Sequence, residues 1–177
     1  MANSDTTLSG EPRLASAPQA ARPDMPDYGI SADADGLLPW QHVSEQMAAA
    51  RNYWIGTVRP DGRPHATPVW GVWVDETFYF GMGPRSVKAR NLAANPALVV
   101  HLESGDDVVV LEGVAESISA LDPVLFERIA DQYAAKYNGF RPEPPSAETP
   151  FVALRCRVAF GWQETDFVRS ATRWTFE

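Results

Sequence analysis

The stretch YWIGTVRPDGRPHATPVW, residues 53–70, decides the fold. It contains two runs rich in β-branched and aromatic residues, with Asp61-Gly62 between them. An Asp-Gly pair between two such runs is a strong signal for a β-hairpin, because both residues tolerate the backbone angles of a tight turn. Pro68 falls inside the second run, and a proline cannot donate a hydrogen bond to a neighbouring strand. The stretch therefore predicts an antiparallel hairpin whose second strand lies at a sheet edge or contains a bulge.

The same pattern of short strands and turns continues along the chain. Strands are expected at Tyr53–Val58, 65–74, Thr77–Gly81, 97–102, 108–117, 151–160 and 172–176. Helical spacing predicts helices over 38–51 and 86–95, and Asp122-Pro123 opens a third helix. Many short strands with few helices between them favour an antiparallel barrel over a parallel sheet. We therefore expect a mainly β fold with a few helices, in which residues 53–116 build half of a small β-barrel.

Residues 1–36 differ in composition from the rest of the chain. They are rich in Ala, Ser, Pro and Asp and show little apolar periodicity. Such a segment cannot bury enough apolar surface to offset the entropy lost on ordering. We expect residues 1–36 to form a mobile tail and residues 37–177 to form one folded domain.

The formal net charge is −8, from 15 basic and 23 acidic residues. An acidic protein is a poor match for nucleic acid, whose binding depends on neutralising phosphates with basic side chains. No apolar run approaches the roughly 18 residues of a membrane-spanning helix, and the N-terminus lacks the basic and apolar regions of a signal peptide. The single cysteine, Cys156, fits a reducing compartment, and the three histidines are not in metal-ligand spacing. We expect a cytoplasmic protein that binds no nucleic acid, membrane or metal.

The most informative segment for function is GPRSVKARNL, residues 83–92. It begins in a Gly-Pro turn and enters the helix expected over 86–95, for which Ser86 is an N-cap candidate. A helix N-terminus attracts anions through its free N–H groups and positive dipole end, and Arg85, Lys88 and Arg90 add positive charge. The segment indicates a phosphate site. The alternative is an ordinary solvated helix start, which also attracts serine and tolerates basic residues.

Other ligand contacts are less specific when judged from the residues alone. His65 follows the hairpin turn and is either a ligand contact or a histidine satisfied within its strand. The tryptophans at positions 70, 73, 162 and 174 could stack on a flat ring, although aromatic residues in barrel strands are more often core or interface. Neither Gly-x-Ser-x-Gly nor Gly-x-Gly-x-x-Gly occurs, so neither a serine nucleophile nor a Rossmann site is indicated. A redox step would need a bound cofactor, because no protein side chain here accepts a hydride.

Two of these segments resemble a known family. The run GTVRPDGRPH, residues 56–65, followed by Pro68-Val69-Trp70, is similar to the opening hairpin of the pyridoxamine 5′-phosphate oxidase-like family. This is the FMN-binding split-barrel, or flavin/deazaflavin oxidoreductase, superfamily. The run SVKARNLAANP, residues 86–96, resembles its phosphate-binding turn and helix, and residues 113–116 and 172–176 resemble a later strand and the C-terminal segment. The similarity covers roughly residues 38–177.

The resemblance implies a six-stranded antiparallel split β-barrel that works as a homodimer. FMN or the deazaflavin coenzyme F-420 would lie in a groove between the two chains. The helix start would hold the cofactor phosphate. The second hairpin strand and the segment after residues 77–81 would run along the ring system. Two C-terminal positions would approach the cofactor from one of the two subunits. The implied contacts are, in that order, Ser86, Lys88, Arg90 and Asn91 at the phosphate, His65, Thr67, Pro68, Val69, Trp70 and Met82 along the ring, and Trp162 and Arg173 near the C-terminus.

One departure from the family pattern bears on the reaction. Pyridoxamine phosphate oxidases carry an Arg-x-His element that holds the substrate, whereas this chain has Arg173-Trp174-Thr175. Vitamin B6 oxidation is therefore disfavoured, and the Lys-x-Arg-Asn-Leu form is closer to members that use F-420, whose acidic tail suits a basic patch. The leading hypothesis is an oxidoreductase that uses bound F-420 or FMN for hydride transfer to a small organic substrate. The alternative is a non-catalytic protein that binds or carries a flavin, a deazaflavin or haem.

Overall fold

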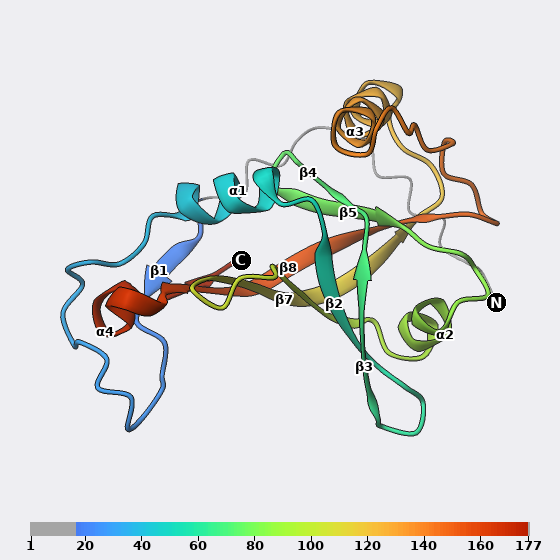
Figure 1. The fold of residues 1–177 in the computed structure, drawn as a ribbon. Coiled ribbons are helices and arrows are strands. Elements are labelled where there is room, and N and C mark those ends of the chain that lie inside the picture. Colours follow the sequence, from blue (N-terminus) through green and yellow to red (C-terminus); the bar gives the residue numbers. More distant parts are fainter. Residues whose placement is uncertain (1–16, 177) are drawn as a thin grey trace.

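The computed structural model describes residues 17–176, which form one antiparallel sheet flanked by four helices (Figure 1). The strands are β1 (Gln19–Ala21), β2 (Tyr53–Val58), β3 (Pro64–Val69), β4 (Val72–Val74), β5 (Thr77–Gly81), β6 (Ala97–His101), β7 (Asp107–Ile118), β8 (Phe151–Gln163) and β9 (Thr172–Thr175). The helices are α1 (Trp40–Ala49), α2 (Val87–Ala94), α3 (Pro123–Lys136) and α4 (Phe167–Ser170), with a short 3-10 turn at Glu164–Asp166. Neighbouring strands follow the order β1-β9-β8-β7-β6-β2-β3, and β5 pairs with both β4 and β8.

The predicted hairpin is present as β2 and β3, which pair antiparallel along their whole lengths. Gly62 has φ 83°, in the left-handed region that favours glycine. The amide of Arg59 donates to the carbonyl oxygen of Arg63 at 2.9 Å and closes the turn. Within the described part of the chain β3 pairs with β2 alone, so the edge position predicted from Pro68 is confirmed.

The strand expected over residues 65–74 is divided in two, which corrects the prediction. β3 ends at Val69 and β4 begins at Val72. Between them, the Tyr137 hydroxyl accepts from the Gly71 amide at 2.8 Å and lies 2.9 Å from the Gly71 carbonyl oxygen. A Cβ atom on Gly71 would lie only 2.4 Å from the Phe78 ring, so the backbone passes β5 too closely for a side chain. A residue far along the chain therefore satisfies the backbone at this break in place of a neighbouring strand.

The main core lies between the sheet and α1. In Figure 1, α1 and α3 lie on the same side of the sheet, and both contact β4. The fully buried side chains of this core include Val43, Met47, Tyr53, Ile55, Phe78, Phe80, Val100, Leu111 and Trp174. A second cluster joins α3 to the sheet through Ile129, Tyr133 and Phe151. Because side chains alternate along a strand, the residues between these core positions face outward.

The long strands β7 and β8 lie in the middle of the strand order and pair along almost their whole lengths. Both extend beyond the ranges 108–117 and 151–160 that the sequence predicted. Their register shifts between Glu112 and Gly113, where Arg157 on β8 is left without a partner residue. Arg157 is the extra residue of this β-bulge, and its side chain is exposed.

Residues 17–36, part of the segment for which a mobile tail is predicted, contact the folded domain. β1 pairs with β9 and extends the sheet. The Arg22 side chain donates to main-chain carbonyl oxygens of both the N-terminal and C-terminal segments, namely those of Asp33, Asp35, Arg169 and Ala171. One guanidinium can satisfy several carbonyls because it carries five N–H donors, and residue composition does not reveal such a contact. Residues 1–16, the rest of the expected tail, lie outside the described residues.

The architecture is mainly β, antiparallel and poor in helix, as the sequence predicted. The nine strands in residues 17–176 exceed the seven expected ranges because one range is divided and β1 is added. None of the helices in this part of the chain is long and apolar enough to cross a membrane. The cytoplasmic location stays a prediction.

Candidate functional site

The N-terminus of α2 is built as the sequence predicted. Ser86 precedes the helix with extended backbone angles, and its hydroxyl accepts from the amide of Ala89 at 3.3 Å. The amides of Val87 and Lys88 lie in the same first turn, where an α-helix provides no internal acceptor. These N–H groups and the positive dipole end form a site suited to an anion.

Three basic side chains surround this helix start. Arg85 and Arg90 are exposed and Lys88 is half-buried. None of the three forms an ion pair with another residue in the range 17–176. Other arginines are paired with carboxylates, namely Arg63, Arg128, Arg141, Arg155 and Arg169. This local positive charge, in a protein with a net charge of −8, can attract an anionic ligand.

Asn91 faces the interior and not the helix start. Its side chain is buried, and its amide donates to the Thr57 hydroxyl at 2.9 Å. That hydroxyl also lies 3.3 Å from Nδ1 of His65. Thr57 was not among the predicted site residues, although the alternation of β2 places this polar residue in line with buried Ile55. The chain of contacts from Asn91 to His65 fixes α2 against the hairpin, and contact of either residue with a cofactor stays a prediction.

A groove of about 500 Å³ lies beside the hairpin. Its lining is mostly apolar and comes from β2, β3, β6, β7 and β8, including Gly56, Val58, Pro64, Ala97, Val99 and Val158. The titratable side chains in it are His65, Glu112 and Arg157. Arg157 is the bulge residue of β8, so the bulge supplies a positive charge to the groove. Neither Glu112 nor Arg157 was predicted as a site residue, because the groove brings together residues of strands that are distant in the sequence.

The predicted ring contacts are divided between the two faces of β3. The inward face carries His65, Thr67 and Val69. Pro68 lies on the outward face, and Trp70 lies just beyond the strand with 48% of its surface exposed. Met82 follows β5 and packs half-buried against the main core. These residues follow one edge of the sheet, but they do not form a single surface.

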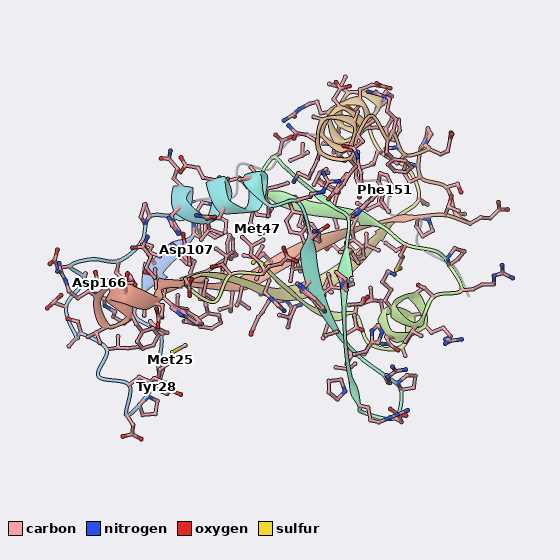
Figure 2. The ribbon with its side chains drawn as sticks, in the orientation of Figure 1. Met25, Tyr28, Met47, Asp107, Phe151 and Asp166 are labelled. Carbon is pink, nitrogen blue, oxygen red and sulfur yellow. The ribbon has the colours of Figure 1, made fainter. Side chains whose placement is uncertain are left out.

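Trp162 and Arg173 lie at the other end of the chain's sheet from α2. The Trp162 ring packs edge-on against Phe167 of α4, with centroids 5.8 Å apart, and Arg173 is on the adjacent strand β9. Figure 1 shows α4 and α2 at opposite ends of the sheet. In Figure 2, Asp166 marks the α4 end, whereas Phe151, where β8 begins, lies toward the opposite side. One chain therefore brings α2 and the hairpin together, but not the two C-terminal positions.

Burial shifts the pKa values of two further side chains, Cys156 and Lys136. Burial raises the pKa of the Cys156 thiol to about 12, so the thiol stays protonated at neutral pH and is a poor nucleophile. Burial lowers the pKa of the Lys136 amine to about 8, and its Nζ donates to the Tyr53 hydroxyl at 2.7 Å. Among the described residues, no group of three or more His, Cys, Asp or Glu side chains could hold a metal ion.

A match to a known family spans residues 40–163, which is well over half of the chain. The matching family is described as pyridoxamine 5′-phosphate oxidase. The chain belongs to the pyridoxamine 5′-phosphate oxidase family. The span includes both segments that carried the resemblance, the hairpin at residues 56–65 and the helix start at residues 86–96, so the resemblance is confirmed. No sequence among the curated proteins matches this chain.

Three solved structures illustrate the similarity of the fold. A conserved hypothetical protein of Mycobacterium tuberculosis is 25% identical with a TM-score of 0.61, and the match covers 75% of this chain and 89% of that one. A protein described as an F-420 reductase is 27% identical with a TM-score of 0.50, covering 65% and 94%. A FAD-binding protein of Mesorhizobium loti is 19% identical with a TM-score of 0.55, covering 78% and 96%, and shows the fold alone. The predicted split-barrel fold is confirmed.

Proposed function

We propose that this member of the pyridoxamine 5′-phosphate oxidase family is an oxidoreductase that binds F-420 or FMN and passes a hydride to a small organic substrate. The observation that carries the proposal is the start of α2. There Ser86 caps the helix and the first-turn amides are available to a ligand. Arg85, Lys88 and Arg90 form no ion pair with a carboxylate of the described chain. The similarity to an F-420 reductase at 27% identity supports the choice of cofactor class.

The residues of α2 fit a phosphate-bearing cofactor. A phosphate at the helix start would accept hydrogen bonds from the first-turn amides and would interact with the charges of Lys88 and Arg85. The cofactor would supply the hydride chemistry, which no side chain of this protein can supply. The role of the protein is to hold the phosphate, to orient the ring system along the β3 edge and to exclude water with apolar side chains.

We also propose that the working form is a homodimer. Trp162 and Arg173 are the family positions expected at the cofactor, yet they lie at the α4 end of the sheet, away from α2. A second copy of the chain can bring its α4 end to the α2 end of the first. This arrangement would complete two identical sites, each with residues from both chains.

Cofactor titration tests the phosphate site. The double variant Lys88→Ala with Arg90→Ala should weaken the affinity for F-420 and for FMN about tenfold or more, because charge-assisted hydrogen bonds are lost. The matched control is Arg128→Ala with Arg141→Ala, which removes two arginines already paired with carboxylates on and near α3. This control should leave the affinity unchanged. An unchanged affinity in the first double variant would exclude the helix start as the phosphate site.

The bound cofactor can be identified directly. The absorbance spectrum and the mass of the molecule that co-purifies with the protein distinguish a flavin from a deazaflavin. A flavin spectrum selects FMN-type chemistry, and a deazaflavin spectrum selects F-420. A Soret band in their place would contradict both and favour a haem-binding protein.

A non-catalytic cofactor carrier is the second candidate, because the groove offers few proton donors. Its titratable side chains are His65, Glu112 and Arg157, and His65 already has the Thr57 hydroxyl as a neighbour at 3.3 Å. Turnover of the reduced cofactor against a panel of electron acceptors separates the two functions. Consumption faster than that of the free cofactor supports an enzyme, and tight binding without faster consumption supports a carrier.

A further inference from the structure

The chain contains two lysines, and they lie in different surroundings. Lys88 is in the first turn of α2, whereas Lys136 is the last residue of α3. The Nζ atom of Lys136 donates to the hydroxyl of Tyr53, a residue buried in the main core on the side of the sheet that α1 covers. Trp54 is the next residue on β2 and faces the other side, because side chains alternate along a strand. Lys136 therefore lies apart from the phosphate site at α2.

The surroundings of the Lys136 amine favour its neutral form. An ammonium group carries three N–H donors. Within residues 17–176 the amine has one hydrogen-bond acceptor, the Tyr53 hydroxyl oxygen at 2.7 Å, and that hydroxyl gives its own proton to the main-chain oxygen of Met47 at 2.6 Å. No carboxylate in the same range pairs with Lys136. The Tyr53 ring, 5.0 Å away, attracts the cation, but burial outweighs this attraction and lowers the pKa of the amine from 10.5 to about 8.

A neutral amine keeps the lone pair that attacks an electrophilic carbon. At pH 7.4 about one fifth of an amine with a pKa of 8 is neutral, against about one part in a thousand at a pKa of 10.5. Removing an amine from water is a general way in which proteins activate a lysine. The Lys136 side chain is half-buried, so part of it stays open to a small reagent. Lys136 thus has the properties of a nucleophile.

Arg51 places a positive charge at the same end of α3. Its exposed guanidinium donates to the main-chain oxygen of Lys136 and lies over the Tyr137 ring, 5.5 Å from the centroid. The Tyr137 hydroxyl lies 2.7 Å from the main-chain oxygen of Arg51 and fixes this segment. Arg51 forms no ion pair within the described range. A guanidinium held in this way has N–H donors left for the oxygens of a phosphate.

We propose that Lys136 is a site of acylation by acyl phosphates, small electrophiles with a phosphate leaving group. The Lys136 nitrogen attacks the carbonyl carbon and forms a C–N bond, and the bond from that carbon to the phosphate oxygen breaks. Phosphate leaves with the electron pair, and the surplus proton on the nitrogen passes to water. The Arg51 guanidinium attracts the phosphate of the donor.

The product of this reaction fits the same surroundings. It is a neutral amide, so it carries no charge for burial to oppose. Its N–H group still serves the Tyr53 hydroxyl oxygen, which accepts from the amine at 2.7 Å before the reaction. The reaction needs no cofactor, so the proposal holds whether or not the α2 helix start binds one.

Site-resolved mass spectrometry tests the proposal on the full chain. The protein is incubated with acetyl phosphate at pH 7.4, and acetylation of Lys136 and Lys88 is followed over time. Lys136 should react about tenfold faster, because a larger fraction of a buried amine is neutral. In urea that unfolds the protein, the two lysines should react at similar rates, because the burial is lost. Equal rates in the folded protein, or a faster reaction at Lys88, would overturn the proposal.

The variant Arg51→Gln tests whether the donor is recognised by its phosphate. It should slow the acetylation of Lys136 by acetyl phosphate about threefold, as expected for an exposed charge pair. The reaction with p-nitrophenyl acetate, a neutral donor, should keep its rate. The matched control is Arg63→Gln, an exposed arginine after the turn between β2 and β3, which should change neither rate. An unchanged rate with acetyl phosphate in Arg51→Gln, or an equal loss with the neutral ester, would overturn the assignment of acyl phosphates as donors.

Discussion

At the scale of single residues, Lys136 is the side chain whose charge the fold opposes. Its Nζ donates to the Tyr53 hydroxyl at 2.7 Å and lies 5.0 Å from the centroid of that ring. Burial lowers its pKa from 10.5 to about 8. Between these two values the unfolded chain holds a proton that the folded protein has released, so folding becomes more favourable as the pH rises. We expect the free energy of unfolding to increase from about pH 8 toward pH 10.

The variant Lys136→Met tests this pH dependence by urea unfolding at a series of pH values. It keeps most of the apolar stem and leaves Tyr53 its hydrogen bond to the Met47 carbonyl oxygen at 2.6 Å. The increase above pH 8 should disappear, whereas Lys88→Met, which removes the other lysine, should retain it. Above about pH 10 stability should fall in both variants, because burial raises the pKa of Tyr53 and Tyr133. An increase of full size in Lys136→Met would contradict the assignment.

Sequence distance decides which site residues could be predicted. Ser86 and the amide of Ala89 are three positions apart, so the local pattern was enough to identify the cap. Asn91 belongs to the same run, but its partner is Thr57 on β2, and no local rule connects the two. Glu103 and Trp70 line the same small pocket only because β2 lies between β3 and β6. Their grouping is a property of the sheet order.

At the scale of elements, the bulge between β7 and β8 requires Gly113. A Cβ atom at this position would lie 2.0 Å from the carbonyl oxygen of Arg155 and 2.8 Å from its carbonyl carbon. These are backbone atoms, which cannot move aside as a flexible side chain can. Gly113→Ala should lower the free energy of unfolding by about 1–3 kcal/mol, the usual cost of overpacking. Gly81→Ala on β5 is the control, because its Cβ would meet the Phe151 ring at an ordinary 3.6 Å. Equal stability of the two variants by chemical denaturation would show that the bulge adapts.

Elements closed by local turns could be predicted, and elements that depend on distant partners could not. The hairpin of β2 and β3 was predictable because Gly62 and its neighbours form the turn themselves. The division after β3 depends on Tyr137, 66 positions from Gly71. β1 forms because β9 offers it an edge, and Arg22 fixes it there across 149 positions to Ala171. Composition reports none of these long-range contacts.

At the scale of the whole molecule, the outer face of the sheet is an apolar surface that the described chain leaves partly open. One row of residues crosses five paired strands on this face, namely Trp54, His101, Val110, Phe160 and Arg173, and all five are half-buried. The core helix α1 packs on the opposite face, where Tyr53 and Ile55 are buried. Surfaces of this kind commonly bind a partner. The row ends at Arg173, one of the two predicted cofactor positions that a single chain does not bring to α2. This supports a second copy of the chain as the partner.

Phe160→Asp tests whether this face holds two copies together. A charge within the row should convert a dimer to a monomer in light scattering and should weaken cofactor binding at the same time. Val124→Asp, at a position 70% exposed on α3, should change neither property. A second experiment leaves Phe160 unchanged. When chains carrying Lys88→Ala are combined with chains carrying Arg173→Ala, a shared site predicts that each mixed dimer regains one intact site, although neither parent dimer has any. Mixed dimers that bind no more cofactor than their parents would show that Lys88 and Arg173 do not serve a common site.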